Sequence, residues 1–195
     1  MERGDGKKAF PYTLIILAGG SSRRMKQDKA LLPVADGTLI EYILQKLQGY
    51  FVDTLLSVSD PSKLQFLEQK IVVDEKPDCG PMMGIKTALA FSQTEKSFAI
   101  ACDIPVFPSD LLVEILCAGK NHEIVVPVAA DGHIEPLFAL YSKSVQPRME
   151  QLLNNGVRSL LPLMDRRNTH FIQMESDSLQ NLNTRQDYKA FIRQL

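Results

Sequence analysis

Long apolar runs and an even set of cysteines are both missing from this chain of 195 residues. No apolar stretch approaches the roughly 18–20 residues that a membrane-spanning helix needs. The charged start MERGDGKKAFP also lacks the apolar centre of a secretory signal. The three cysteines, Cys79, Cys102 and Cys117, lie far apart without CxxC spacing. Neither a disulfide framework nor a zinc site follows, so we expect a cytoplasmic protein.

The chain also lacks an excess of charge of either sign. Its 22 Lys and Arg residues nearly balance 23 Asp and Glu residues, which gives a net charge of −1. Such a balance argues against nucleic acid or a membrane surface as the partner. Any binding of anions must therefore come from a local cluster of positive charge.

What is present is a regular alternation of apolar runs and helical patterns. The pattern predicts strands over 12–18, 53–59, 71–74, 97–102, 123–129, 136–142 and 169–174. It predicts helices over 39–47, 61–69, 81–93, 108–118, 144–155, 158–165 and 185–194. Strands that alternate with helices indicate an α/β fold with a mostly parallel central sheet and helices on both faces. We expect a mobile N-terminal tail over 1–11 and a single domain over 12–195.

The stretch LAGGSSRRMKQDKALL (17–32) concentrates glycine and positive charge directly after a predicted strand. Glycine lets backbone N–H groups approach phosphate oxygens closely, and Lys or Arg adds charge-assisted hydrogen bonds. Arg23, Arg24, Lys26 and Lys29 supply that charge. Neither GxxxxGK[ST] nor GxGxxG is present, so the two best-known phosphate loops are excluded. The stretch predicts a triphosphate site, with a solvated basic loop as the alternative.

Further polar groups follow other predicted elements. Asp103 in CDIP stands at a strand end, where a carboxylate suits Mg²⁺ that is shared with substrate phosphates; a turn or capping aspartate is the alternative. Asp74 or Asp78, near GPMMG (80–84), has the acceptors that a guanine edge needs, although an ordinary loop has the same composition. Asn181 and Asn183 lie two residues apart in NLNT, so an extended segment would project both to one face. A turn followed by a Thr184 cap is the alternative.

Five segments, in order, resemble the motifs of one enzyme family. They are LAGGSSRRMKQDKALL (17–32), GPMMGI (80–85), CDIP (102–105), EPLFALY (135–141) and NLNT (181–184). The first is similar to the LAGGxSxRMGxDKALL signature of nucleotidyltransferases that make dinucleotide forms of the molybdenum cofactor. The ordered set resembles the molybdenum cofactor guanylyltransferases, the MobA family. Two departures are Lys26 in place of glycine and Arg185 in place of proline.

The resemblance implies a Rossmann-like nucleotidyltransferase fold and the transfer of GMP from GTP to molybdopterin or its molybdenum-loaded form. It implies GTP contacts from Leu17, Ala18, Gly19, Gly20, Lys29, Asp74, Gly80 and Asp103, and catalytic roles for Arg23, Lys29 and Asp103. Asp103 would hold Mg²⁺, and Arg158, Asn181 and Asn183 would bind the acceptor. The nucleotide part would span about 12–105 and the acceptor part about 106–195.

The resemblance also implies protein partners: a metal-insertion protein, and apo-molybdoenzymes or their chaperones. Three other functions stay open on the sequence alone. A cytidylyltransferase for the same cofactor would share the phosphate and metal motifs but differ in the base-reading segment. A nucleotidyltransferase for another small phosphate would share the first motif only. A non-catalytic GTP-binding module would bind nucleotide without metal-dependent turnover.

Overall fold

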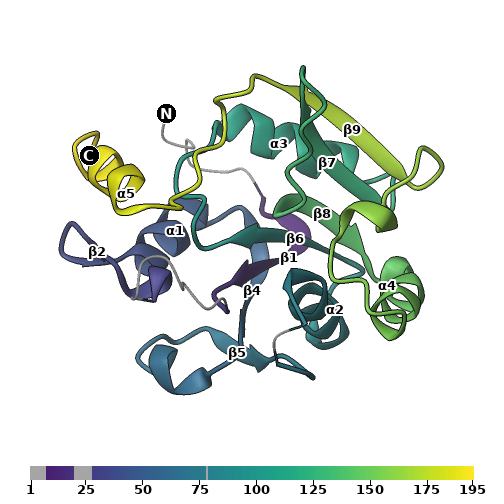
Figure 1. Cartoon of the computed structure of the whole chain (residues 1–195), viewed down its shortest axis with the longest axis horizontal. Helices are drawn as coiled ribbons and strands as arrows, with labels where there is room; N and C mark the ends of the chain where they lie inside the picture. Colours follow the sequence, from purple (N-terminus) through teal and green to yellow (C-terminus); the bar gives the residue numbers. More distant parts are fainter. Residues whose placement is uncertain (1–7, 20–27, 78) are drawn as a thin grey trace.

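A seven-stranded sheet forms the centre of the computed structural model, which describes residues 8–19, 28–77 and 79–195 (Figure 1). The strands run in the spatial order β5-β4-β1-β6-β8-β7-β9. They are β1 (Phe10–Leu17), β4 (Phe51–Val58), β5 (Lys70–Val73), β6 (Lys96–Ala101), β7 (Ile124–Ala129), β8 (Phe138–Ser142) and β9 (Thr169–Met174). Every neighbouring pair is parallel except those of β8, which is antiparallel to β6 and β7. The short connection from β7 to β8 explains the exception, because a parallel return needs a dozen or more residues.

Helices cover both faces of this sheet. They are α1 (Leu39–Leu47), α2 (Pro81–Phe91), α3 (Ser109–Ala118), α4 (Gln146–Asn154) and α5 (Arg185–Ile192). The apolar side chains of α1, α3 and α5 belong to one core cluster with Leu14 and Ile16, and those of α2 and α4 belong to another with Ile15 and Leu17. Strand β1 therefore buries alternate residues in two cores, as a doubly wound sheet requires. The predicted α/β fold class is confirmed.

The predicted helix over 61–69 is wrong. Only a 3-10 helix, Pro61–Leu64, forms there, with Asp60 accepting a hydrogen bond from the backbone N–H of Ser62 at 3.0 Å. Leu64 is buried, whereas Phe66 is 54% exposed. The segment thus buries only Leu64 fully, with Leu67 partly buried against the same core, and a longer helix would have little apolar face to pack.

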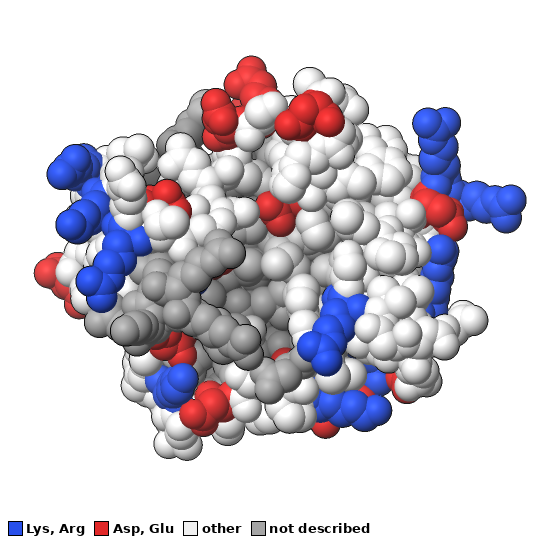
Figure 2. Space-filling view, viewed as in Figure 1, with Lys and Arg blue, Asp and Glu red and all other residues white. Residues whose placement is uncertain are grey.

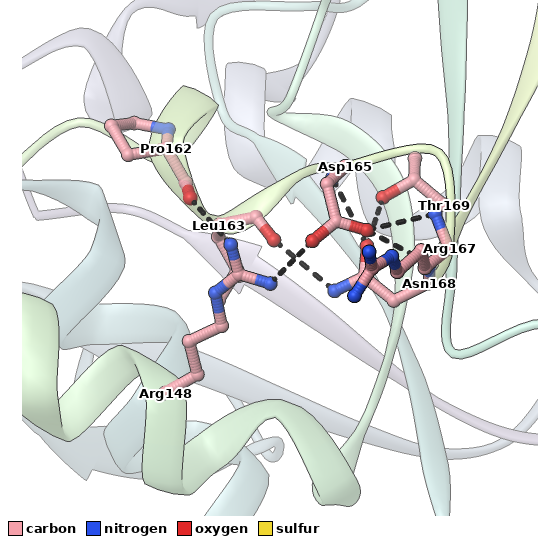
Figure 3. Close-up of polar contacts among 7 residues, drawn as sticks. All are labelled: Arg148, Pro162, Leu163, Asp165, Arg167, Asn168 and Thr169. Atoms are coloured by element: carbon pink, nitrogen blue, oxygen red, sulfur yellow. Dashed lines mark hydrogen bonds and ion pairs between the residues drawn. The ribbon is translucent and has the colours of Figure 1, made fainter.

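The predicted helix over 158–165 is also wrong, and side chains from outside the segment hold it in another conformation (Figure 3). Only the 3-10 helix Leu161–Leu163 forms. The Arg148 guanidinium donates to the carbonyl oxygen of Pro162 at 3.1 Å, and Asn168 Nδ2 donates to that of Leu163 at 3.2 Å. Asp165 completes the web with an ion pair of 2.9 Å to Arg148. The segment is therefore a loop fixed by polar contacts.

Two smaller differences concern the N-terminal half. Strand β1 begins at Phe10, so the last two residues assigned to the N-terminal tail belong to the sheet, while residues 1–7 lie outside the described residues. A hairpin of β2 (Pro33–Val34) and β3 (Gly37–Thr38) was not predicted, since strands of two residues leave no periodic pattern. In the described part of the chain, no helix is long and apolar enough to cross a membrane.

Candidate active site

The carboxyl ends of four neighbouring strands bring the predicted loops together at one edge of the sheet. Leu17 at the end of β1 pairs with Ser57 of β4 and with Ala101 of β6. Val58 of β4 pairs in turn with Val73, the last residue of β5. Ala18, Gly19, Asp74 and Asp103 therefore follow strand ends that lie side by side, as ligand-binding residues do in open α/β sheets. On the described part of the face in Figure 2, positive and negative side chains are interspersed.

Lys29 is the centre of a polar cluster that joins three of the predicted motifs. Its ammonium group donates to Asp103 Oδ2 at 2.7 Å and to Asn183 Oδ1 at 3.1 Å. The lysine stands on the 3-10 helix Lys29–Leu31, where Asp28 accepts a hydrogen bond from the backbone N–H of Ala30 at 3.2 Å. The Lys29 and Asp103 side chains are 17% and 24% exposed, which leaves the pair open to a ligand yet weakly screened by water. We refer to Lys29, Asp103 and Asn183 as the charge cluster.

Backbone pairing delivers Asn183 from the far end of the chain. Residues 180–182 run antiparallel to residues 103–106, with the Gln180 N–H donating to Val106 O at 3.1 Å and the Leu182 N–H donating to Asp103 O at 2.7 Å. Leu182 points into the core. Asn181 and Asn183 flank this buried residue, and the Asn183 N–H donates to Asn181 O at 3.1 Å, so the segment makes a tight turn and is not the extended one that we expected.

A cap then fixes the end of the same segment. Thr184 Oγ1 accepts hydrogen bonds from the N–H groups of Gln186 and Asp187 at the start of α5, so the predicted Thr184 cap is confirmed. The Asp187 carboxylate accepts in return from the N–H groups of Asn183 and Thr184, at 2.9 and 2.7 Å. This capping box holds Asn183 in place next to Lys29.

Asp74 forms a second polar site, which it shares with Ser57 of the neighbouring strand. Ser57 Oγ donates to Asp74 Oδ1 at 2.9 Å. Burial raises the pKa of the Asp74 carboxyl, and the hydrogen bond from Ser57 offsets part of that rise. A carboxylate that loses water in this way gains from any ligand that returns N–H donors to it.

Two glycines shape the helix beside Asp74. A Cβ added to Gly84 would lie 2.7 Å from Ser57 Oγ and 3.4 Å from Asp74 Oδ1, so α2 approaches these groups closely only because residue 84 is glycine. Gly80 precedes α2 with a φ of +77°, a conformation that favours glycine. The second glycine of GPMMG thus has a packing role that its spacing alone did not reveal.

Arg158 lies beside Gly80. A Cβ added to Gly80 would lie 3.3 Å from Arg158 Cβ. Arg158 is exposed and makes no hydrogen bond or ion pair with the residues that the structure describes. Its predicted contact with the acceptor phosphate remains a prediction, made from a position next to the start of α2.

Glu135 is a buried acidic residue for which the sequence suggested no role. Its Oε2 accepts a hydrogen bond from Asn181 Nδ2 at 3.1 Å, and only 8% of its surface is exposed. Asn181 Oδ1 is buried and has no hydrogen-bond partner among the described residues. The sequence offered one signal for Glu135, an acidic side chain directly before an apolar strand. Glu135 is part of the motif EPLFALY (135–141), but no role was predicted for it.

Several predicted residues fall outside the described ranges, and the remaining acids do not form a metal cage. Gly20, Arg23 and Asp78 are not described, and neither are Arg24 and Lys26. Within 8–19, 28–77 and 79–195, no group of three or more His, Cys, Asp or Glu side chains could hold a metal ion. Cys102, next to Asp103, is buried, and burial raises the pKa of its thiol, as is typical of a cysteine that packs as a small apolar residue.

Comparison with known proteins identifies the family of this chain. Residues 14–170 match the MobA-like NTP transferase domain family. The "Probable molybdenum cofactor guanylyltransferase" of Carboxydothermus hydrogenoformans is 33% identical over 189 residues, covering 93% of this chain and 95% of that protein. The "Molybdenum cofactor guanylyltransferase" of Haemophilus influenzae strain 86-028NP is 33% identical over 188 residues, covering 91% and 96%.

A solved structure shows the same fold. The crystal structure of molybdopterin-guanine dinucleotide biosynthesis protein A from Archaeoglobus fulgidus superposes with a TM-score of 0.77 at 23% identity, over 93% of this chain and 97% of that one. The central sheet with helices on both faces is thus the nucleotidyltransferase fold that the motifs implied. The chain belongs to the MobA-like NTP transferase family and is a nucleotidyltransferase.

Proposed function

We propose that the protein transfers GMP from GTP to the terminal phosphate of molybdopterin or Mo-molybdopterin and releases pyrophosphate, with Mg²⁺ as its cofactor. The observation that carries this proposal is the charge cluster. It joins a phosphate-loop lysine, a strand-end carboxylate and an amide of the segment assigned to the acceptor within 3.1 Å. Donor and acceptor phosphates that meet at such a point are aligned for transfer.

The reaction needs alignment and charge neutralisation more than covalent chemistry by the protein. A terminal phosphate oxygen of the acceptor attacks the α-phosphorus of GTP, the bond from that phosphorus to the bridging oxygen breaks, and pyrophosphate leaves with the electron pair. Lys29 has three ammonium donors, and the contacts to Asp103 and Asn183 use two of them. The third has no partner among the described residues, so it can donate to a phosphate oxygen, where charge builds up as the transfer proceeds.

The donor set around Asp103 fits a magnesium ion that the substrate helps to hold. Mg²⁺ binds through one or two carboxylates together with substrate phosphates, and it prefers hard oxygen ligands. Lys29 engages Asp103 Oδ2, which leaves Oδ1 without a hydrogen-bond partner among the described residues. Once bound by Asp103, the ion would supply positive charge to the triphosphate.

Asp74 supports guanine as the base. The carboxylate has two oxygens and accepts hydrogen bonds only, which suits the adjacent N1–H and N2–H₂ donors of guanine. Cytosine presents its amine next to an acceptor nitrogen, so it would leave one Asp74 oxygen unpaired. Leu17, Ala18, Gly19 and Gly80 border the same edge and would contact the nucleotide through their backbones.

The remaining partners follow from this function. We propose a cytoplasmic enzyme that receives molybdopterin from, or beside, a metal-insertion protein and passes its product to apo-molybdoenzymes or their chaperones. Nucleic acid and membranes are not among the proposed partners, in keeping with the balanced charge of the chain.

Pyrophosphate release tests the proposal directly. Purified protein is incubated with molybdopterin and Mg²⁺ in parallel with GTP, CTP or ATP. We expect turnover with GTP and little with the other two. Turnover with CTP would keep the chemistry and overturn the role of Asp74. Binding of GTP without turnover would favour a non-catalytic module.

A further inference from the structure

The carboxylate of Glu135 is held in one orientation by the start of β8. Its Oε1 accepts a hydrogen bond from the backbone N–H of Leu137 at 3.3 Å, and its Oε2 accepts from Asn181 Nδ2 at 3.1 Å. The backbone on either side is fixed as well, since the Glu135 N–H donates to Pro127 O and the Phe138 N–H donates to Glu135 O. Glu135 thus offers Asn181 a rigid, buried acceptor.

This contact determines which end of the Asn181 amide is turned away from Glu135. An ionised carboxylate accepts hydrogen bonds and donates none, so Asn181 must turn its NH₂ group toward Glu135. The carbonyl oxygen, Oδ1, then points away from Glu135, and it is buried without a partner in the described part of the chain. Folded proteins rarely leave a buried acceptor unpaired, which points to a hydrogen-bond donor from a ligand.

The position of Asn181 indicates which part of a ligand it meets. Asn181 and Asn183 flank a tight turn at Leu182, where the Asn183 N–H donates to Asn181 O at 3.1 Å, so the two residues lie close together in space. Asn183 belongs to the charge cluster, where positive charge attracts phosphate. Asn181 Oδ1 would repel a phosphate oxygen, because both atoms are acceptors. Asn181 therefore suits a part of the ligand that carries N–H groups, one step away from its phosphate.

We propose that Glu135 is a positioning residue that fixes the Asn181 amide, so that Asn181 Oδ1 accepts a hydrogen bond from an N–H group on the ring of the acceptor substrate. This inference rests on the proposed function, since it takes a nitrogen-bearing ring with a terminal phosphate as the acceptor. It adds to that function a role for Glu135, which does not contact the substrate. Glu135 determines that Asn181 offers the substrate its carbonyl oxygen and not its NH₂ group.

Glu135→Gln tests the inference with a change of one atom. The Leu137 N–H still needs the Gln oxygen, so the new NH₂ group faces Asn181 and forces its amide to turn over. We expect KM for molybdopterin to rise about tenfold, with kcat and KM for GTP within about twofold of wild type. Glu123→Gln is the matched control, because Glu123 also accepts a hydrogen bond, from Ser144, but makes no contact with Asn181. An unchanged KM for molybdopterin in Glu135→Gln would overturn the inference.

A double variant separates orientation from general damage. Asn181→Asp alone places two carboxylates side by side and should raise KM for molybdopterin at least as much as Glu135→Gln does. Combined with Glu135→Gln, it restores a donor–acceptor pair and still turns an oxygen toward the ligand. We expect KM for molybdopterin in the double variant to return to within about threefold of wild type. Additive losses, or a change in the Mg²⁺ requirement in place of KM, would contradict a role at the acceptor ring.

A spectroscopic readout keeps this inference distinct from the proposed function. The Asn181 side-chain NH₂ signal, identified by its loss in Asn181→Asp, should be downfield and slow to exchange in wild type and should lose both properties in Glu135→Gln. If wild type shows these properties but no guanylyl transfer, the proposed function fails while the orientation of Asn181 stands. An exposed, rapidly exchanging signal in wild type would overturn the inference whatever the activity.

Discussion

The Asp74 site and the charge cluster each place a carboxylate at the same edge of the sheet, but the two carboxylates have different partners. Asp74 follows strand β5 and Ser57 lies near the end of the neighbouring strand β4. The Asp74 carboxyl is half-buried, and its pKa is raised. Lys29, Asp103 and Asn183 come from three distant segments; Lys29 and Asp103 form an ion pair, and Asn183 accepts a hydrogen bond from Lys29. The Asp74 site can select a base, because a base that leaves the partly desolvated Asp74 carboxylate without hydrogen-bond donors binds less well. The charge cluster suits phosphate, which every nucleotide shares.

The largest effect is expected from removing the negative charge of the charge cluster. Asp103→Asn keeps the shape of the side chain but loses the carboxylate that pairs with Lys29 and would bind Mg²⁺. We expect kcat for pyrophosphate release to fall about 10²–10³-fold, while GTP still binds by calorimetry. Asp110→Asn, on the exposed start of α3, is the control. Full activity in Asp103→Asn would remove the charge cluster from the chemistry.

A smaller loss, confined to one nucleotide, is expected at Asp74. Asp74→Asn replaces one acceptor oxygen with an NH₂ group, so one guanine donor loses its partner. We expect kcat/KM for GTP to fall about 10–100-fold, equivalent to about 1–3 kcal/mol, with the value for CTP little changed. Asp36→Asn, in the exposed β2–β3 turn, should leave both values unchanged. An equal loss for GTP and CTP would show that Asp74 does not read the base.

Gly84→Ala should affect stability through the same site. The new methyl group would lie 2.7 Å from Ser57 Oγ, so the hydroxyl must move and lose its hydrogen bond to Asp74. We expect the free energy of unfolding in urea to fall by about 1 kcal/mol. In a Ser57→Ala background the same substitution should cost less, because the contact with the hydroxyl is gone and only the close contact of 3.0 Å to Leu17 Cδ2 remains. Equal costs in both backgrounds would rule out this coupling.

The smallest expected effect is a pH dependence that arises from the Asp74 site. The pKa of Asp74 is raised in the folded state, so the native protein binds more protons than the unfolded chain between the two pKa values. Stability from this group is thus full below the unfolded pKa and declines as the pH rises through the folded one. Asp74→Asn should therefore raise Tm slightly at pH 7 and not at pH 3. In wild type, GTP affinity should weaken as the pH falls through the Asp74 pKa, since protonation removes an acceptor; a pH-independent affinity would contradict this.

Local sequence signals predicted most of the sheet and its two covered faces. The unbroken apolar run of β1 and the apolar face of α1 are short-range patterns, and both elements formed where expected. The helices over 61–69 and 158–165 failed because packing and side-chain hydrogen bonds decided those segments. Neither the single buried leucine of the first nor the contacts from Arg148 and Asn168 in the second has a local signature.

The candidate site was predictable by residue type and not by contact. Asp103 and Lys29 were each singled out from a loop after a strand, but nothing in the spacing indicated an ion pair of 2.7 Å between them. The link from Asn181 to Glu135 spans 46 residues and depends on how residues 180–182 pair with residues 103–106. Such pairings arise from the three-dimensional topology, which the local patterns limit but do not specify.

The most direct test of the central claim follows the phosphorus atoms of GTP. The protein is incubated with molybdopterin, Mg²⁺ and GTP labelled with ³²P at either the α or the γ position, and the pterin product is separated from the nucleotides. The account predicts that the α label enters the pterin product and that the γ label leaves as pyrophosphate. Label from the γ position in the product, or the γ label released as free phosphate with no labelled product, would contradict guanylyl transfer at the charge cluster.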